Sequence, residues 1–127
     1  MSNDLVQFLR ARLDEDEAYA RNAFGDHNDA GPDWYEQWSG ALNIGEAEDL
    51  VMTNDSQVSR FMERHDPACV LREVGAARQA IEHYERVAAR SQQHPDYELA
   101  TGAVEVQLKI RALPYAAHPD YHEEWAP

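Results

Sequence analysis

The sequence contains few of the residues on which disulfide, metal and cofactor chemistry depend. Cys69 is the only cysteine, so the chain cannot form an internal disulfide. No Cys-x-x-Cys, His-Glu-x-x-His or Glu-x-x-His pattern occurs, and these spacings are typical of zinc and di-iron sites. A Walker loop, a Gly-x-Ser-x-Gly elbow and a dinucleotide-binding glycine pattern are also missing. We therefore expect no metal, no cofactor and no catalytic residue of a recognisable motif.

Long apolar runs and basic residues are scarce as well. No apolar run approaches the roughly 20 residues that span a bilayer, and Met1 to Arg12 is too charged for a secretory signal. These two features predict a cytoplasmic protein without a membrane role. Acidic residues outnumber Lys plus Arg by 24 to 11, which leaves a formal charge of −13. Such a charge repels nucleic-acid backbones, so direct nucleic-acid binding is disfavoured unless the arginines gather on one face.

The clearest pattern that the sequence does contain is the spacing of an amphipathic helix between Asp66 and Arg90. Asp66 can cap its first turn, and Pro67 fits the position where a missing N–H costs nothing. Apolar residues recur there at steps of three and four, as expected for one helical face. They are Val70, Leu71, Val74, Ala77, Ile81, Tyr84 and Ala88.

Similar spacing predicts further helices on both sides of this central one. The first begins at Ser2 or Asn3 and ends near Phe24, and a short one is capped by Asp55. A last long helix is capped by Asp96. Its apolar stripe, which we expect to be buried against the central helix, contains Leu99, Ala103, Val106, Ile110 and Leu113.

The length of 127 residues and these patterns predict one helical domain over residues 1–127. Its fold is expected to be mainly α, a small bundle of three to four helices. Because a chain this short leaves apolar area to cover, the stripe of the central helix could continue across a two-fold axis. The sequence is therefore compatible with a homodimer as well as with a monomer.

Turn-forming residues are concentrated between Gly25 and Gly45, after the first helix. Trp34, Tyr35 and Trp38 lie in this stretch. It predicts either a short β-hairpin, in which residues 33–38 pair with 49–53, or an irregular aromatic loop. The three aromatic side chains either anchor a protein partner or fold back over the end of the core.

A second group of aromatic residues, Tyr115, Tyr121 and Trp125, lies in the non-helical tail formed by residues 114–127. We expect this tail to dock on the bundle, where it either seals the seam between helices or anchors a partner. His118 and His122 are the nearest approach to a pair of metal ligands. Pro119 would leave His118 outside a final helical turn, so we interpret both as surface histidines.

Four consecutive acidic residues, Asp14, Glu15, Asp16 and Glu17, lie within the predicted first helix. They form an acidic docking face, a set of carboxylate metal ligands, or a solvated helix side that arginines four residues away partly compensate. A nucleic-acid mimic would need these carboxylates in a continuous row with those of residues 46–49 and 123–124.

Three segments carry more specific sequence, namely LVQFLRARLDEDE (Leu5 to Glu17), RHDPACVLREV (Arg64 to Val74) and ALPYAAHPDYHEEW (Ala112 to Trp125). In this order they resemble an uncharacterised family of small actinobacterial and actinophage proteins, catalogued as a domain of unknown function. The resemblance implies a cytoplasmic protein from a high-GC source with a phage or mobile-element connection, and it implies no activity. Many members carry cysteines suggestive of zinc after the central helix, but this chain has none between Val70 and Pro127.

These observations lead to three functional hypotheses. The first is a small acidic, non-enzymatic interaction or regulatory protein with an unidentified protein partner. The second is an acidic nucleic-acid mimic that inhibits a host defence or DNA-processing protein. The third is an enzyme whose site is assembled from distant residues. A pocket lined by several of His65, His83, His94 and Glu105 would support this hypothesis.

Overall fold

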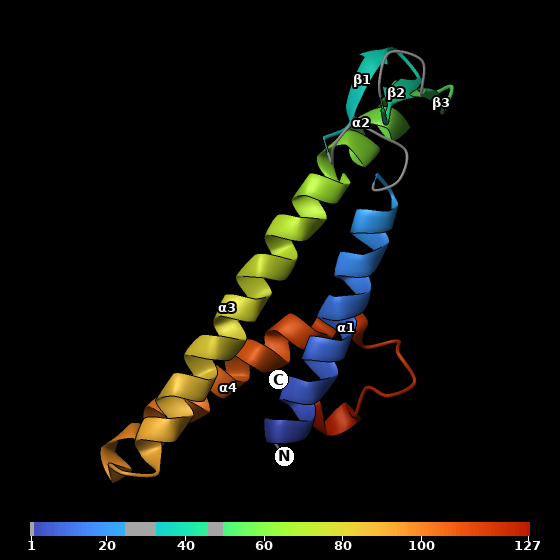
Figure 1. The fold of residues 1–127 in the computed structure, drawn as a ribbon. Helices are drawn as coiled ribbons and strands as arrows, with labels where there is room; N and C mark the ends of the chain where they lie inside the picture. Colours follow the sequence, from blue (N-terminus) through green and yellow to red (C-terminus); the bar gives the residue numbers. More distant parts are fainter. Residues whose placement is uncertain (1, 25–32, 46–49) are drawn as a thin grey trace. The chain divides into compact units, whose positions relative to one another are not determined.

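The structure, a computed structural model, describes residues 2–24, 33–45 and 50–127 and is mainly α-helical (Figure 1). The predictions of a mainly α fold and of short β-structure after the first helix are confirmed. The elements in chain order are α1 (Ser2–Asn22), β1 (Tyr35–Trp38), β2 (Ala41–Asn43), β3 (Leu50–Met52), α2 (Ser56–Arg64), α3 (Pro67–Ser91), the 3₁₀ helix η1 (Pro95–Tyr97), α4 (Glu98–Ala112), η2 (Leu113–Tyr115) and η3 (Glu123–Trp125).

The contacts within the chain define two units. One contains Met1–Asp14 and Gly75–Pro127, and the other contains Glu15–Val74. The helices α1 and α3 each contribute a segment to both units. The expectation of one domain over residues 1–127 stays a prediction. None of the helices in the described ranges is both long and apolar enough to cross a membrane.

In the first unit, the beginning of α1 lies beside the second part of α3, and the last residues of the chain return to α1 (Figure 1). Within this unit, Ala77, Ile81 and Tyr84 of the predicted central stripe are buried, with Ile81 and Tyr84 only 2% and 6% exposed, whereas Ala88 is half-buried. The buried apolar side chains of this unit are Leu5, Val6, Phe8, Leu9, Leu13, Ala77, Ile81, Tyr84, Leu108, Ala112 and Trp125.

Helix α4 turns back from the end of α3 but presents the opposite face from the one expected. Leu99 is 87% exposed, and Val106, Ile110 and Leu113 are 43–45% exposed. The expectation that this stripe is buried is therefore wrong. Leu108 and Ala112, on the other side of the helix, are buried instead. Periodicity could not decide between them, because α4 carries small or apolar residues at helical spacing on both faces.

In the second unit, three short antiparallel strands are arranged in the order β1-β2-β3. The expected pairing of residues 33–38 with 49–53 is wrong, because β2 lies between the two. A strand of three residues is too short to show alternation, and Asn43 is a typical turn residue. The tight turn between β1 and β2 contains Gly40 at φ +79°, which a side chain would disfavour.

The two short-range caps predicted in this unit are confirmed. The Asp55 side chain accepts a hydrogen bond of 2.8 Å from the N–H of Gln57 at the start of α2. Asp66 Oδ1 accepts one of 2.9 Å from the N–H of Cys69 at the start of α3. The prediction for Asp96 is wrong, because this residue lies inside η1 and α4 begins without a side-chain cap.

Candidate interaction surfaces

The pairing of the strands determines which side chains share a face of the sheet. Opposite residues in antiparallel strands point to the same side. Tyr35 is opposite Asn43, and Trp38 is opposite Ala41, which in turn is opposite Met52. Asn43 Nδ2 donates a hydrogen bond of 3.1 Å to the hydroxyl of Tyr35, which places both on one side.

The opposite side of the sheet faces α2. Glu36 Oε1 accepts a hydrogen bond of 3.1 Å from the hydroxyl of Ser56 in α2. Leu42, which is paired with Glu36, is fully buried. Tyr35, Trp38 and Met52 therefore point away from α2, and we call these three residues the sheet face. They are 50%, 50% and 56% exposed.

Two carboxylates close the outer edge of β1. The N–H of Glu36 donates a hydrogen bond of 2.9 Å to Oε1 of Glu63. The N–H of Trp34, one residue before the strand, donates one of 3.0 Å to Oδ2 of Asp66. An unpaired strand edge would attract a strand from another protein. Because these amides are already bonded, the face of this sheet is better suited to contact a partner than the edge of β1.

Trp34 lies apart from Tyr35 and Trp38. It is half-buried and lines a pocket of about 270 Å³ together with Tyr19, His65 and Val70. Its indole Nε1 is buried and has no hydrogen-bond partner among the described residues. Of the three aromatic residues that the sequence groups together, two are displayed on the sheet face and Trp34 packs beside the start of α3.

The three aromatic residues of the tail surround Phe8 of α1. Their ring centroids lie 6.3 Å (Tyr115), 6.0 Å (Tyr121) and 5.0 Å (Trp125) from that of Phe8. Trp125 is 3% exposed, and Tyr115 and Tyr121 are half-buried. These side chains pack against the helix instead of projecting into solvent, as a structural seal does.

A buried arginine completes this aromatic cluster. The guanidinium of Arg12 lies 5.2 Å from the ring centroid of Phe8, and the residue is 8% exposed. Arg12 also contacts the ring nitrogens of His118, and its Nη1 lies 2.9 Å from Nδ1. A cation over an aromatic face is stabilised by the ring quadrupole, most strongly where water is excluded.

The two tail histidines have separate partners. His118 contacts Arg12, whereas His122 stacks on Trp125 with ring centroids 4.4 Å apart and lies 3.5 Å from Glu124. In the part of the chain that the structure describes, no three side chains of His, Cys, Asp or Glu are grouped so that they could hold a metal ion.

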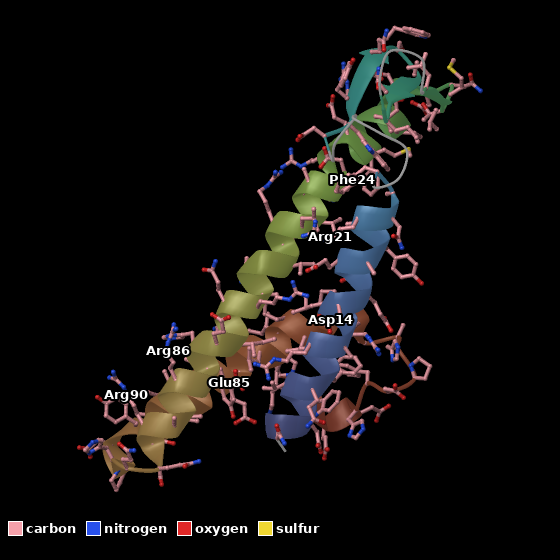
Figure 2. The ribbon with its side chains drawn as sticks, viewed as in Figure 1. Asp14, Arg21, Phe24, Glu85, Arg86 and Arg90 are labelled. Carbon is pink, nitrogen blue, oxygen red and sulfur yellow. The ribbon has the colours of Figure 1, made fainter. Side chains whose placement is uncertain are left out.

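The acidic residues of α1 are partly compensated by arginines. Asp14 accepts a hydrogen bond of 2.8 Å from Arg78, and Glu17 accepts one of 3.3 Å from Arg21. Glu15 and Asp16 also have interaction partners. Figure 2 shows Asp14 on α1, and the ion pair with Arg78 links this helix to α3. Residues 46–49, the next part of the proposed acidic row, lie outside the described residues.

A groove of about 470 Å³ follows the last turns of α3. His83, Arg86, Arg90 and Tyr97 line it, together with Val87 and Ala89. Figure 2 shows Arg86 and Arg90 extending from the same side of the helix. Two guanidinium groups and an imidazole can hold an anionic group. His94 and Glu105 are not among the lining residues, so of the four residues named for an enzyme this groove contains His83 alone.

Two features were missed in the sequence. The first is that Met52 belongs to the sheet face. The short apolar run from Leu50 to Met52 was the signal in the sequence that could have predicted a strand there. The exposed stripe of α4 was recognised as a stripe but assigned to the core. Its alternating steps of four and three residues are equally typical of a seam between two chains.

Comparison with known proteins adds one finding. No curated protein and no solved structure matches the chain. A family model described as "Family of unknown function (DUF6221)" matches residues 2–127. The resemblance seen in three short segments is thus supported by a match over almost the whole length. The chain belongs to the DUF6221 family of unknown function.

Proposed function

We propose that the protein is a small acidic, non-enzymatic interaction protein that binds a partner protein through the sheet face. The observation that supports this proposal is the half-exposed position of Tyr35, Trp38 and Met52 on one side of the sheet. Tyr and Trp are enriched among the residues that contribute most to binding, and Met adapts to irregular apolar surfaces. The partner should therefore offer apolar pockets for two aromatic rings.

The charge of the chain constrains the partner further. With a formal charge of −13, the protein attracts surfaces on which basic residues surround an apolar centre. We propose a regulatory role towards such a partner. The resemblance to actinophage proteins favours a partner in a high-GC host cell, contacted by a phage or mobile-element product.

The alternatives have less support in the described residues. A nucleic-acid mimic would present unpaired carboxylates, yet Asp14 and Glu17 form ion pairs with Arg78 and Arg21. An enzyme would gather polar groups around a pocket, yet His65 lines the pocket of Trp34 whereas His83 lines the groove of α3. Protein binding is therefore better supported than either a nucleic-acid mimic or an enzyme.

Affinity capture with matched variants tests the proposal. The tagged protein is incubated with an actinobacterial lysate, and enriched proteins are quantified by mass spectrometry. The test variant replaces Tyr35, Trp38 and Met52 by Ala. The control replaces Val58 and Phe61 by Ala, because these residues of α2 are 45% and 64% exposed but lie off the sheet face. Circular dichroism verifies that both variants fold.

The expected result is a partner that the wild type and the control enrich and the test variant loses. Titration of the purified partner should then show an affinity at least about tenfold lower for the test variant, as for loss of an interface hot spot. Equal capture by all three proteins, or no enriched partner at all, would contradict the proposal.

A further inference from the structure

The exposed stripe of α4 has the spacing of a coiled-coil seam. Leu99, Ala103, Val106, Ile110 and Leu113 follow one another at steps of four, three, four and three residues, and we call them the α4 seam. Such steps correspond to the core positions of a heptad repeat, which keeps one apolar line facing a second helix. Leu113 continues the seam past the end of α4 because its backbone is still helical, at φ −54° and ψ −39°.

Burial shows that the seam is incompletely covered by the described residues of its own unit, because Val106, Ile110 and Leu113 are still 43–45% exposed. Leu108 and Ala112 on the opposite side of α4 are 1% and 0% exposed, so the helix already has one face in the core. The seam is a second apolar face, with Leu99 87% exposed at its beginning. A helix with two apolar faces typically packs against a neighbouring element on each of them.

We propose that the α4 seam pairs with the α4 seam of a second copy of this chain in antiparallel orientation and forms a homodimer. The seam is self-complementary because equivalent helices related by a two-fold axis present the same residues to each other. Val106 lies midway between Leu99 and Leu113, so in an antiparallel pair the two copies of Val106 lie opposite each other and Leu99 of one copy lies opposite Leu113 of the other.

The charges of α4 favour the antiparallel orientation. Glu98 and Glu105 lie in the first two thirds of the helix, and Lys109 and Arg111 lie in the last third. In an antiparallel pair, the acidic part of each helix faces the basic part of the other. In a parallel pair, acidic residues would face acidic residues. Antiparallel pairing also aligns the two helix dipoles favourably.

The size of the seam sets the strength expected of the dimer. Helix α4 has 15 residues and is therefore about 22 Å long. Five side chains over this length cover less than the roughly 800 Å² per partner of a standard interface. The charge of −13 on each copy also opposes association. We expect a dissociation constant in the micromolar range, which decreases when added salt screens this repulsion.

Sedimentation equilibrium over a series of concentrations tests whether the dimer exists. The mass should rise from 14.5 kDa towards twice this value as the concentration increases. Val106→Glu and Ile110→Glu should each raise the dissociation constant by about tenfold or more, because a charge would be buried without a partner. Ala100→Glu is the matched control, since it adds the same charge a quarter of a turn away from the seam and should leave the dimer intact. A monomer at all concentrations, or no difference between Val106→Glu and the control, would overturn the proposal.

Cysteine cross-linking in a Cys69→Ser background tests the orientation. Val106→Cys lies near the centre of the antiparallel seam and should form a disulfide with its own copy under mild oxidation. Leu99→Cys should not, because the two copies of this residue would lie about 20 Å apart, but it should cross-link with Leu113→Cys in a mixture. Efficient self-cross-linking of Leu99→Cys would overturn the antiparallel arrangement. A failure of these tests leaves the sheet-face proposal to be judged separately, because that proposal depends on other residues.

Discussion

The N–H of Trp34 donates a hydrogen bond of 3.0 Å to the carboxylate of Asp66, a residue 32 positions later in the chain. The same carboxylate accepts a bond from the N–H of Cys69 and so caps α3. Asp66 is 6% exposed. One buried side chain therefore both starts the central helix and holds the segment that leads into the sheet.

Replacing Asp66 by Ala should lower the free energy of unfolding by about 2–4 kcal/mol. Loss of a helix cap costs about 1 kcal/mol, and a buried N–H left without a partner costs a further 1–3 kcal/mol. Urea denaturation measures the change. Asp55→Ala is the control, because Asp55 caps α2 and is exposed, and it should cost only about 1 kcal/mol. Equal losses for the two variants would mean that the bond to Trp34 does not contribute.

Replacement by Ala should cost very different amounts of stability at two tryptophans. Trp125→Ala should cost about 3–5 kcal/mol of stability, because Trp125 is buried against Phe8 and a cavity would remain. Trp38→Ala should cost less than about 1 kcal/mol, because Trp38 is half-exposed on the sheet face. Thermal and urea unfolding measure both. A large loss for Trp38→Ala would show that this side chain supports the fold and would weaken its role in binding.

The carboxylate at the edge of β1 should control the exchange of one amide. Glu63→Ala removes the acceptor of the Glu36 N–H, and the hydrogen-exchange rate of that amide should rise by about tenfold, the equivalent of losing one hydrogen bond of ordinary strength. The amide of Leu42 in the central strand serves as the internal reference and should change little. The variant should also self-associate more readily, which light scattering detects. An unchanged rate at Glu36 would contradict the closed edge.

Replacement by Ala should change the stability of the protein in opposite directions at two glycines. Gly102→Ala should raise stability by about 0.5–1 kcal/mol, because Gly102 is exposed in α4 and an added Cβ meets nothing within 4 Å. Gly40→Ala should lower stability by about 1–3 kcal/mol, because φ is +79° and the Cβ would lie 3.1 Å from the backbone of Asn54. Denaturation is best measured at a concentration where the chain is monomeric. A loss of stability for Gly102→Ala would indicate a neighbour that a single chain does not show.

Local chemistry explains which parts of the fold could be predicted from the sequence. Asp55 and Asp66 act within one helical turn, so their caps follow from neighbouring residues alone. The face of α4 that is buried depends on what surrounds the helix, and the sequence offers two suitable faces. The strand β2 depends on its neighbours in the sheet, because three residues have little preference of their own.

The candidate site could be predicted only in part for the same reason. The sequence shows two groups of aromatic residues but not their different environments. The aromatic residues of the tail pack around Phe8, whereas Tyr35 and Trp38 are half-exposed. Only contacts between distant segments separate a packing role from a binding role. The position of Met52 on the same side of the sheet as Trp38 likewise follows only from the strand pairing, in which both lie opposite Ala41.

The contact between Phe8 and Trp125 has a consequence for how the protein is made. Almost the whole chain lies between these residues, so α1 leaves the ribosome long before the rings that cover it. During synthesis, the apolar side chains of α1 that are buried in the folded protein stay exposed until the tail is made; they include Leu5, Phe8 and Leu9. Contacts between residues so far apart in the chain also form slowly. A nascent chain stalled shortly before Trp125 should therefore engage chaperones through its first helix.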